Sequence, residues 1–558
     1  MLLSSCILLS TLIAPRALAQ GPIVSLDYGA FQGAADGSFS KFLGIPFSEP
    51  PARFELPRLP VTPLQGTQDA TSYAPVCPQQ YPTTDAPISE DSLAYAGLKL
   101  DVFTPSSATS ASNLPVLVWI HGGAWELGTS ADQDPRPLVE HAISRNAPIV
   151  VVTPNYRLSA LGFLGGREVA NAGISNLGLR DQIVALEWVQ KYISQFGGDP
   201  GKVVISGGSA GAISSTLLML ENNQLDTASL PFRGIFTLSG AMLPATTLTG
   251  PSAQSMYDAL VSANGCSGAA DTLGCLRAVP LAAFQSTVQA GPGVFSQTSL
   301  SPYANWFPLI DGDVIVRKPW ESVRMGRFAR IPIMTGSSDD EGTLFSLSNT
   351  DITQVNEVLY RAADFSPEPT ASSSITSLPT IFQTQLQARS LNSEPYILTI
   401  LLDNVGIRLA LVSYRLPILS PEYKRLAAFQ GDYFLIGARR YFLEHAAGTQ
   451  NTWSWLNKRG KLLNGFLGAQ HGSDSNIWFP PALTVDHVGA DYLINFVNTL
   501  NPNDSPTTVN ATGNFWPQWK PDTRELLLFS DLLQVELTTD DFRAPAMAYL
   551  ADVVLKQS

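Results

Sequence analysis

Length and composition describe a large globular protein. The chain has 558 residues, of which 45% are hydrophobic and 15% are charged, so it can bury a large core and is neither disordered nor fibrous. The formal net charge of −13 argues against a nucleic-acid partner, because binding to a phosphate backbone requires clustered Lys and Arg. After the N-terminal segment no run reaches the ~18 uncharged apolar residues of a membrane span, and we expect no transmembrane segment.

The first 19 residues have the pattern of a secretory signal peptide. An apolar stretch is followed by Ala17-Leu18-Ala19, a small-x-small cleavage pattern before Gln20. A positively charged region ahead of the apolar stretch is missing, so a buried first strand or helix is the alternative interpretation. We expect a secreted, extracellular protein whose mature chain, residues 20–558, forms a single domain.

In a secreted protein, cysteines can form disulfides and glycosylation sequons can be used. Cys266 and Cys275 close a short loop, and we expect them to form a disulfide because secreted chains fold in an oxidising environment. Cys77 is then left over. The sequons at Asn503 and Asn510 lie in a stretch rich in Pro, Asn and Thr, which suits glycosylation at the surface.

Short apolar runs rich in Val and Ile recur along the chain. They lie at residues 116–120, 149–152, 203–205, 235–238, 331–334 and 526–529. Runs that are apolar on both faces are typical of buried strands covered by helices. Between the second and third runs, apolar residues at steps of three and four predict an amphipathic helix over residues 176–196, and Gly197 ends it. This alternation predicts an α/β fold: a mostly parallel central sheet with helices on both faces.

The interval from Thr350 to Tyr441 has a different character. It contains Pro- and Ser-rich turns and weakly patterned apolar segments, and no linker-like run flanks it. We interpret this interval as a helical insertion over the sheet, near the active site, and not as a second domain.

The pentapeptide from Gly207 to Gly211 has the pattern G-x-S-x-G, with Ser209 at its centre. It follows the strand-like KVVIS directly and continues into the helical AGAISSTLLML. A serine in this context occupies the strained turn of a nucleophile elbow, and glycines are needed at both ends because a Cβ would clash where strand and helix pass closely. We therefore predict that Ser209 is a nucleophile. A Gly/Ser turn without chemistry is the alternative.

A second glycine-rich turn follows the apolar run VLVWI. In the turn from His121 to Trp125, backbone N–H groups can face a ligand without obstruction by side chains, as an oxyanion hole requires. We predict that Gly123, Ala124 and Ala210 donate these N–H groups. An ordinary tight turn is the alternative for this segment alone.

Seven segments, taken together, carry a family resemblance. They are GIPFSEPPARF (44–54), VWIHGGAW (118–125), NYRLSALGFL (155–164), NLGLRDQIVALEWVQKYISQFGGDPGKVVISGGSAGA (176–212), FPLIDGD (307–313), GSSDDEGTLF (336–345) and GAQHGSD (468–474). These segments resemble the type-B carboxylesterase and cholinesterase-like family of α/β-hydrolases, which includes fungal secreted lipases and sterol esterases. The resemblance spans nearly the whole mature chain and implies the α/β-hydrolase fold and hydrolysis of carboxylic esters.

The resemblance also implies the partners of Ser209. In that family the catalytic acid is the glutamate of an EGT segment, matched here by Glu341, and the catalytic histidine follows a Gly-Ala-x pattern, matched by His471. The chain order Ser, Glu, His agrees with the order expected of this fold. We expect His471 to act as general base and Glu341 to orient it, through an acyl-enzyme intermediate.

The residues themselves leave the choice of histidine open. The chain has 5 histidines, and a serine hydrolase needs one on a loop that can reach the nucleophile. His141 and His445 lie in helix-like stretches, and His121 belongs to the glycine-rich turn. This leaves His471, whose neighbours are typical of a loop, and His487.

The acid lies in the tripeptide Asp339-Asp340-Glu341. A hard-cation site usually gathers more oxygen ligands than one tripeptide presents, so we expect neither a metal nor a cofactor. Because only one of the three carboxylates must turn inward, Asp340 is the alternative to Glu341.

Two features depart from the family pattern. Gly208 precedes the nucleophile where the family usually has Glu, and Cys77 lacks its usual partner, because the following segment offers only Ser92 or Gly97 at that place. The flap between positions 77 and 97 is short and rich in Pro and Thr. Interfacial lipases use a long amphipathic lid, so the short flap favours an esterase.

Two other functions remain as alternatives. A long-chain lipase or sterol esterase of the same family would prefer long acyl chains and an interface. A non-catalytic, cholinesterase-like binding module would retain the fold without the activity, but such members typically lack the nucleophile.

Overall fold

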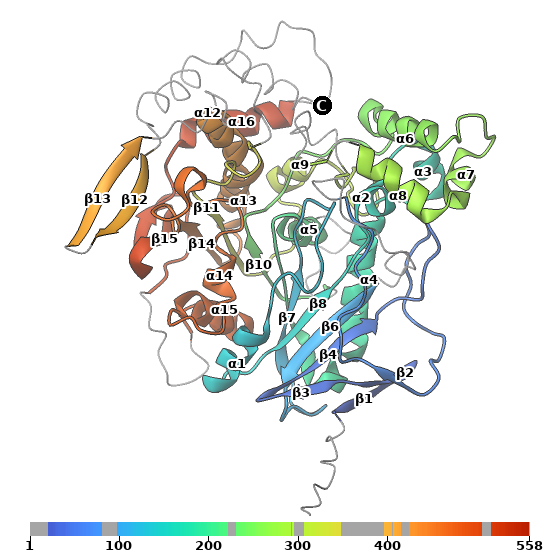
Figure 1. Cartoon of the computed structure of the whole chain (residues 1–558), viewed down its shortest axis with the longest axis horizontal. Coiled ribbons are helices and arrows are strands. Elements are labelled where there is room, and N and C mark those ends of the chain that lie inside the picture. The colour runs from blue at the N-terminus through green and yellow to red at the C-terminus, as the bar shows by residue number, and fades with distance from the viewer. Residues whose placement is uncertain are drawn as a thin grey trace, which may run out of the picture.

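Figure 1 shows the computed structural model of the chain, coloured from the N-terminus to the C-terminus. The structure describes residues 21–80, 98–220, 230–291, 293–294, 306–347, 396–403, 406–413, 423–504 and 515–556. The predicted signal peptide, most of the flap between positions 77 and 97, and the sequon at Asn510 lie outside these residues. None of the described helices is long and apolar enough to cross a membrane.

A large twisted sheet forms the centre of the molecule (Figure 1). In the described residues it has 11 strands in the order β16-β15-β14-β11-β10-β9-β7-β8-β6-β4-β3. The strands are β3 (Ala34–Asp36), β4 (Phe39–Pro46), β6 (Lys99–Pro105), β7 (Leu114–Ile120), β8 (Val150–Pro154), β9 (Gly198–Gly208), β10 (Gly234–Leu238), β11 (Ile333–Ser338), β14 (Thr452–Asn457), β15 (Glu525–Phe529) and β16 (Val535–Thr539). Pairs between β8 and β15 are parallel, and pairs at both edges are antiparallel. A small separate sheet joins β1 (Ile23–Leu26), β2 (Gly29–Gln32) and β5 (Thr67–Asp69).

The predicted apolar runs form β7, β8, β9, β10, β11 and β15, apart from a residue or two at the start of two runs. Successive side chains of a strand point to opposite faces of a sheet, and β7 shows the consequence. Val116 and Val118 belong to one hydrophobic core, whereas Leu117 and Trp119 belong to another. Runs that are apolar at every position are therefore needed, because both faces of the sheet are covered.

Helices build one core on each face. The first core includes residues of α4 (Leu177–Tyr192), α5 (Ala210–Met219), α13 (Gly437–Ala446) and α16 (Ala544–Lys556). The second includes residues of α1 (Arg136–Ser144), α14 (Ser475–Trp478) and α15 (Val488–Thr499). The other described α-helices that precede β11 are α2 (Ser159–Phe163), α3 (Arg167–Ala172), α6 (Pro251–Ala263), α7 (Thr272–Ala278), α8 (Leu281–Ala290) and α9 (Pro319–Arg324). This is the α/β arrangement that the sequence predicts.

The predicted amphipathic helix is α4. It buries apolar residues along its length, continues into a 3-10 turn over Ile193–Phe196, and ends at Gly197, whose φ is +84°. Only glycine adopts this left-handed conformation without strain, and a helix commonly ends there.

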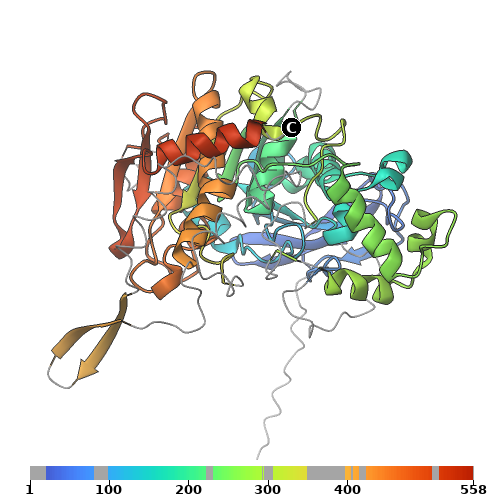
Figure 2. The same cartoon turned by 90° about the horizontal axis from the view of Figure 1, so that it is seen from above.

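The interval from Thr350 to Tyr441 is only partly helical in its described residues. Its C-terminal part is α12 (Tyr423–Gly431), a π-turn over Asp432–Ile436, and the start of α13. However, β12 (Tyr396–Asp403) and β13 (Gly406–Ser413) form an antiparallel hairpin, so the prediction of a helical insertion is wrong for this segment. The hairpin sequence is a dense run of Ile, Leu and Val, which favour strands. The hairpin lies apart from the central sheet in both views (Figures 1 and 2).

Candidate active site

Ser209 lies at a sharp turn between β9 and α5. Its φ of +54° and ψ of −122° are sparsely populated by residues other than glycine, and such strain concentrates at functional sites. The two flanking glycines explain how the turn is possible. A Cβ on Gly207 would lie 2.4 Å from the carbonyl carbon of Gly211, and a Cβ on Gly211 would lie 2.0 Å from the carbonyl oxygen of Ile120. The strand and the helix can therefore meet only through glycine.

The turn after β7 lies against this serine. A Cβ on Gly122 would lie 2.7 Å from the carbonyl oxygen of Gly208 and 3.0 Å from the Cβ of Ser209. Gly123 and Ala124 have positive φ values of +104° and +54°. Within the described chain, no oxygen accepts a hydrogen bond from the N–H groups of Gly123, Ala124 or Ala210, so all three are available to a ligand.

Glu341 and His471 form a buried pair. The Nδ1 atom of His471 lies 2.5 Å from Oε2 of Glu341. The second carboxylate oxygen, Oε1, accepts the N–H of Ser338 at 2.6 Å, and the Glu341 side chain is 0% exposed. Nε2 of His471 is buried and has no hydrogen-bond partner among the described residues. The carboxylate therefore holds Nδ1 of the imidazole ring and leaves Nε2 available.

Ser209 and His471 line the same pocket, which has a volume of about 540 Å³. Ala124 and Ala210 line it too. The other lining residues are almost all apolar: Trp125, Ile213, Leu243, Val294, Phe307, Phe345, Phe434 and Leu435. The predicted nucleophile, base and two N–H donors therefore converge on one apolar cavity, which suits the hydrocarbon part of an ester.

The other histidines do not line this pocket. Nε2 of His141 lies at hydrogen-bond distance, 2.7 Å, from the carboxylate oxygen Oδ1 of Asp491, and His487 stacks on His141 with ring centroids 4.2 Å apart. His445 bonds to the carbonyl of Tyr441. Of the two histidines that the sequence left open, His471 lines the pocket with Ser209, and His487 stacks on His141 instead.

Asp340, the alternative acid, faces a different partner. Its Oδ2 accepts the N–H of Ala469 at 3.0 Å, and its own N–H donates to the carbonyl of Ala469 at 3.0 Å. Lys461 lies between Asp339 and Asp340 and pairs with both. Asp340 thus fastens the loop that carries His471 to the loop that carries Glu341.

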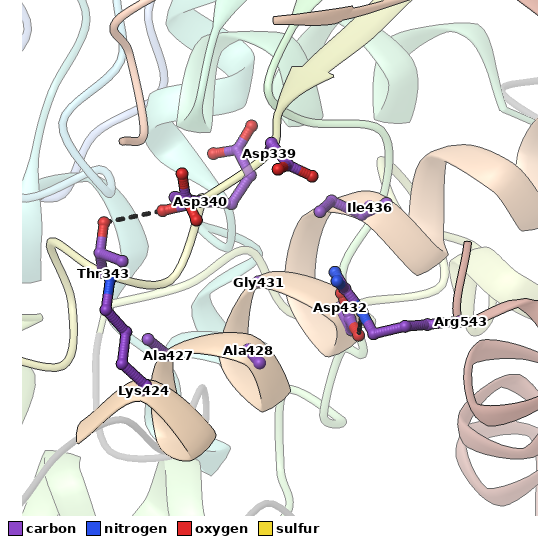
Figure 3. A pocket seen from close by; sticks show the side chains of 11 residues that line it. Asp339, Asp340, Thr343, Lys424, Ala427, Ala428, Gly431, Asp432, Ile436 and Arg543 are labelled. Carbon is purple, nitrogen blue, oxygen red and sulfur yellow. Dashed lines mark hydrogen bonds and ion pairs between the residues drawn. The ribbon is translucent and has the colours of Figure 1, made fainter. Parts of the chain in front are cut away.

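Figure 3 shows a small charged cavity of about 260 Å³ beside these loops. In this view Asp339 and Asp340 lie at one end, and Thr343 donates to the main-chain carbonyl of Asp340 at 2.8 Å. Asp432 and Arg543 form an ion pair at the other end. Within the described ranges, no set of three or more His, Cys, Asp or Glu side chains is arranged to hold a metal ion.

Two buried carboxyls beside the site were missed by sequence reasoning. Burial, and then the charge of Glu341, raise the pKa of Asp474 to about 7. Trp455 donates to Oδ2 of Asp474 at 3.3 Å. In the glycine-rich turn, burial raises the pKa of Glu126 to about 8. Asp474 follows His471 by three residues and Glu126 follows Ala124 by two, so proximity to the motifs was the available signal.

The cysteines are arranged as the spacing suggests. Cys266 and Cys275 form a disulfide. Cys77 is buried without a disulfide partner among the described residues, and burial raises the pKa of its thiol to about 12. A thiol in this state is unreactive at neutral pH.

Comparison with known proteins decides the family. The profile of the carboxylesterase family matches residues 20–543. The chain belongs to the carboxylesterase family. It is a carboxylic ester hydrolase with the α/β-hydrolase fold.

Individual relatives of this carboxylesterase cover nearly its whole length. A secreted triacylglycerol lipase of Gibberella zeae is 33% identical over 95% of this chain and 90% of its own. A secreted lipase of Botryotinia fuckeliana is 34% identical over 96% of this chain and 94% of its own. The crystal structure of EstA from Aspergillus niger superposes with a TM-score of 0.76 at 26% identity, over 96% of this chain and 99% of that one.

Proposed function

We propose that this carboxylesterase hydrolyses its esters through an acyl-enzyme, with Ser209 as nucleophile, His471 as general base and Glu341 as the acid that orients His471. The observation that carries the proposal is the arrangement of the imidazole. Nδ1 of His471 is held by Glu341, while Nε2 has no hydrogen-bond partner among the described residues and the ring lines the same pocket as Ser209. An imidazole held in this way has the tautomer that a general base requires.

The residues would perform the reaction in two similar halves. As Oγ of Ser209 attacks the ester carbonyl carbon, its proton passes to Nε2 of His471, and Glu341 stabilises the imidazolium. The N–H groups of Gly123, Ala124 and Ala210 would stabilise the oxyanion. The carbon–alkoxy bond then breaks, and Nε2 returns the proton to the departing alcohol. Water attacks the acyl-enzyme by the same steps and releases the acid.

The pocket supports an ester with an apolar acyl or alcohol group. Among its described lining residues only Ser209 and His471 carry polar side chains, apart from the indole of Trp125, and that indole donates its N–H to Ser214. Burial of an apolar group in such a cavity is favourable. We propose a carboxylesterase and not an interfacial lipase, because the flap between positions 77 and 97 is short.

A long-chain lipase or sterol esterase is the second candidate. Relatives that are about one-third identical are named secreted lipases. The two functions differ in whether the rate rises with acyl length, which the substrate series described below measures.

We also propose that the protein is extracellular and loses residues 1–19 on secretion. Its relatives that are named secreted lipases and its disulfide support this. Of the two sequons, Asn510 is the better glycosylation site. The side-chain amide of Asn503 is occupied, because it donates to the carbonyl of Trp516 at 2.9 Å and accepts the N–H of Trp516 at 2.7 Å.

The experiment is kcat/KM across p-nitrophenyl esters from acetate to palmitate, with Ser209→Ala as the blank. A maximum at short or medium chains that is absent from the blank supports the carboxylesterase. A maximum at palmitate favours the lipase. A trace no better than the blank for every ester contradicts the proposal and favours a non-catalytic binding module.

A further inference from the structure

Glu126 is a buried carboxyl in the glycine-rich turn that the proposed mechanism does not use. The residue is 1% exposed. Its Oε2 accepts the N–H of Val294 at 2.8 Å, and its Oε1 is buried without a hydrogen-bond partner among the described residues. Val294 lines the ester pocket. The side chain of Glu126 therefore connects the turn that carries the predicted oxyanion donors to one wall of the pocket.

Gln80 forms hydrogen bonds with both the glycine-rich turn and residues on either side of Val294 in the chain. Its N–H donates to the carbonyl of Glu126 at 2.8 Å, and its Nε2 donates to the carbonyl of Gly291 at 3.0 Å. Its Oε1 accepts the indole N–H of Trp306 at 2.8 Å. Gly291 and Trp306 stand at the two ends of the segment that contains Val294, and Gln80 stands at the start of the flap. Three segments of the site thus meet at Gln80 and Glu126.

Gln79 fastens the other end of the turn. Its Nε2 donates to the carbonyl of Gly128 at 2.8 Å, and its Oε1 accepts the N–H of Gly128 at 3.1 Å. Inside the turn, the N–H groups of Glu126 and Leu127 both donate to the carbonyl of Gly123. The position of the Gly123 carbonyl group therefore depends on residues 126–128, which bond to it directly or are held by Gln79.

The surroundings of Glu126 suit a neutral acid. Burial raises its pKa to about 8, and the N–H of Val294 opposes this shift. His121, in the same turn, is buried with its pKa lowered to about 4, mainly by desolvation, so it is uncharged at neutral pH.

Among the described residues, no cation contributes to the pKa shift of Glu126, which has burial as its main cause and the N–H of Val294 as the opposing one. A buried carboxylate that lacks a cation is strongly disfavoured.

We propose that Glu126 is a positioning residue for ester hydrolysis, which holds the oxyanion turn against the Val294 wall of the pocket and keeps the N–H groups of Gly123 and Ala124 aimed at the tetrahedral intermediate. The inference rests on the proposed function of that turn. The neutral acid fits the site, so the turn is held best below pH about 8 and loosens as the carboxyl ionises above it.

The test compares Glu126→Ala with Glu126→Gln. Alanine removes the contact with Val294, whereas glutamine keeps an acceptor for that N–H and cannot ionise. Asp101→Asn is the matched control, because Asp101 is also a buried carboxyl with a raised pKa, of about 6, and does not line the pocket. Rates with p-nitrophenyl butyrate are expressed per active site, counted by titration with an organophosphate, so that misfolded protein does not enter the result.

We expect Glu126→Ala to lower kcat by about tenfold to a hundredfold, the cost of a small misplacement of catalytic groups. KM should change little, because the oxyanion contact is made in the transition state. Glu126→Gln should retain most of kcat at pH 7, and Asp101→Asn all of it. A variant that had only lost folding stability would have fewer active sites but normal turnover at each.

The pH profile gives a second, independent readout. The wild-type kcat should fall as the pH rises through about 8, and Glu126→Gln should lack this fall. A Glu126→Ala variant within about twofold of wild type per titrated site, or a Glu126→Gln profile that superimposes on wild type, overturns the inference. Full activity in Ser209→Ala would instead overturn the proposed function, so the two failures are distinguishable.

Discussion

The oxyanion side and the histidine side of the site are held in place by different kinds of contact. The turn at residues 121–128 is fixed by close glycine packing, by hydrogen bonds that Gln79 and Gln80 make with its main chain, and by the N–H of Val294, which donates to Glu126. The loops that carry Glu341 and His471 are fixed by charges: Asp339 and Asp340 both pair with Lys461. The oxyanion side depends on shape and on a neutral acid, whereas the histidine side depends on charged pairs.

This difference follows from what each side must do. The oxyanion donors must stabilise a negative charge, which a buried carboxylate beside them would oppose, so a neutral acid is compatible there. The imidazole must gain a proton during the reaction, and a nearby carboxylate stabilises it. We expect salt and pH to distinguish the two sides, because screening weakens ion pairs at exposed positions and leaves packing unchanged.

The largest effect should come from the charged side. Glu341→Gln keeps the shape of the side chain but removes the charge that stabilises the imidazolium, and we expect kcat to fall by about 10⁴-fold. Asp340→Asn, one residue away, is the control and should lose far less. A Glu341→Gln variant that retains more than about a tenth of the wild-type kcat would show that Glu341 does not have the proposed role.

The shape-dependent side should be broken by a single methyl group. A Cβ on Gly122 would lie 2.7 Å from the carbonyl oxygen of Gly208, so Gly122→Ala should displace the turn from Ser209 and lower kcat by about 10²-fold to 10³-fold. Gly208→Ala is the matched control, because its Cβ would meet only Trp119, at an ordinary 3.4 Å. Equal activities of the two alanine variants would contradict the packing argument.

Removal of the ion pairs should have an intermediate effect that depends on salt. Lys461→Met removes the one cation that pairs directly with both Asp339 and Asp340 in the described residues, and we expect kcat to fall by about tenfold at low ionic strength. The Lys461 side chain is 38% exposed, so salt can screen its ion pairs. At about 1 M salt, where the Debye length is about 3 Å, the wild-type kcat should therefore fall towards that of the variant. Lys191→Met, which breaks a surface pair with Asp27, is the control. No salt dependence in wild type would count against the role of these charges.

The smallest effect should be that of Asp474. Burial and the charge of Glu341 raise its pKa to about 7, above the value in the unfolded chain, so its contribution to stability is complete at acid pH and is lost as the pH rises through 7. Asp474→Asn should therefore raise Tm more at pH 8 than at pH 5. Activity at pH 8 should fall only a few-fold. A Tm difference independent of pH would show that Asp474 does not titrate as described.

The sequence predicts those parts of the site that depend on local sterics. Gly207 and Gly211, which flank Ser209, lie where strand and helix approach too closely for a Cβ, and such turns leave a short motif. The central parallel strands are predicted for a similar reason, because both faces are buried and every residue is apolar. Strand β14, with the sequence TWSWLN, was not predicted, since its serine and asparagine interrupt the apolar run.

Burial of charged residues is the part that the sequence does not reveal. Glu126 and Asp474 lie close to the motifs, but nothing local shows that they are buried, because neighbours such as Val294 and Glu341 are far away in the chain. The same holds for Asp340, whose partners Lys461 and Ala469 lie more than 100 residues later. Tertiary contacts alone decide these roles.

The most direct test of the central claim is to identify the residue that becomes covalently modified. The wild-type enzyme is treated with a fluorophosphonate, and the modified peptide is found by mass spectrometry while residual activity is followed. We predict one adduct per molecule, on Ser209, in proportion to the activity lost, and no adduct in Ser209→Ala. Inactivation with the adduct on another residue, or full activity after Ser209 is completely modified, would contradict the account.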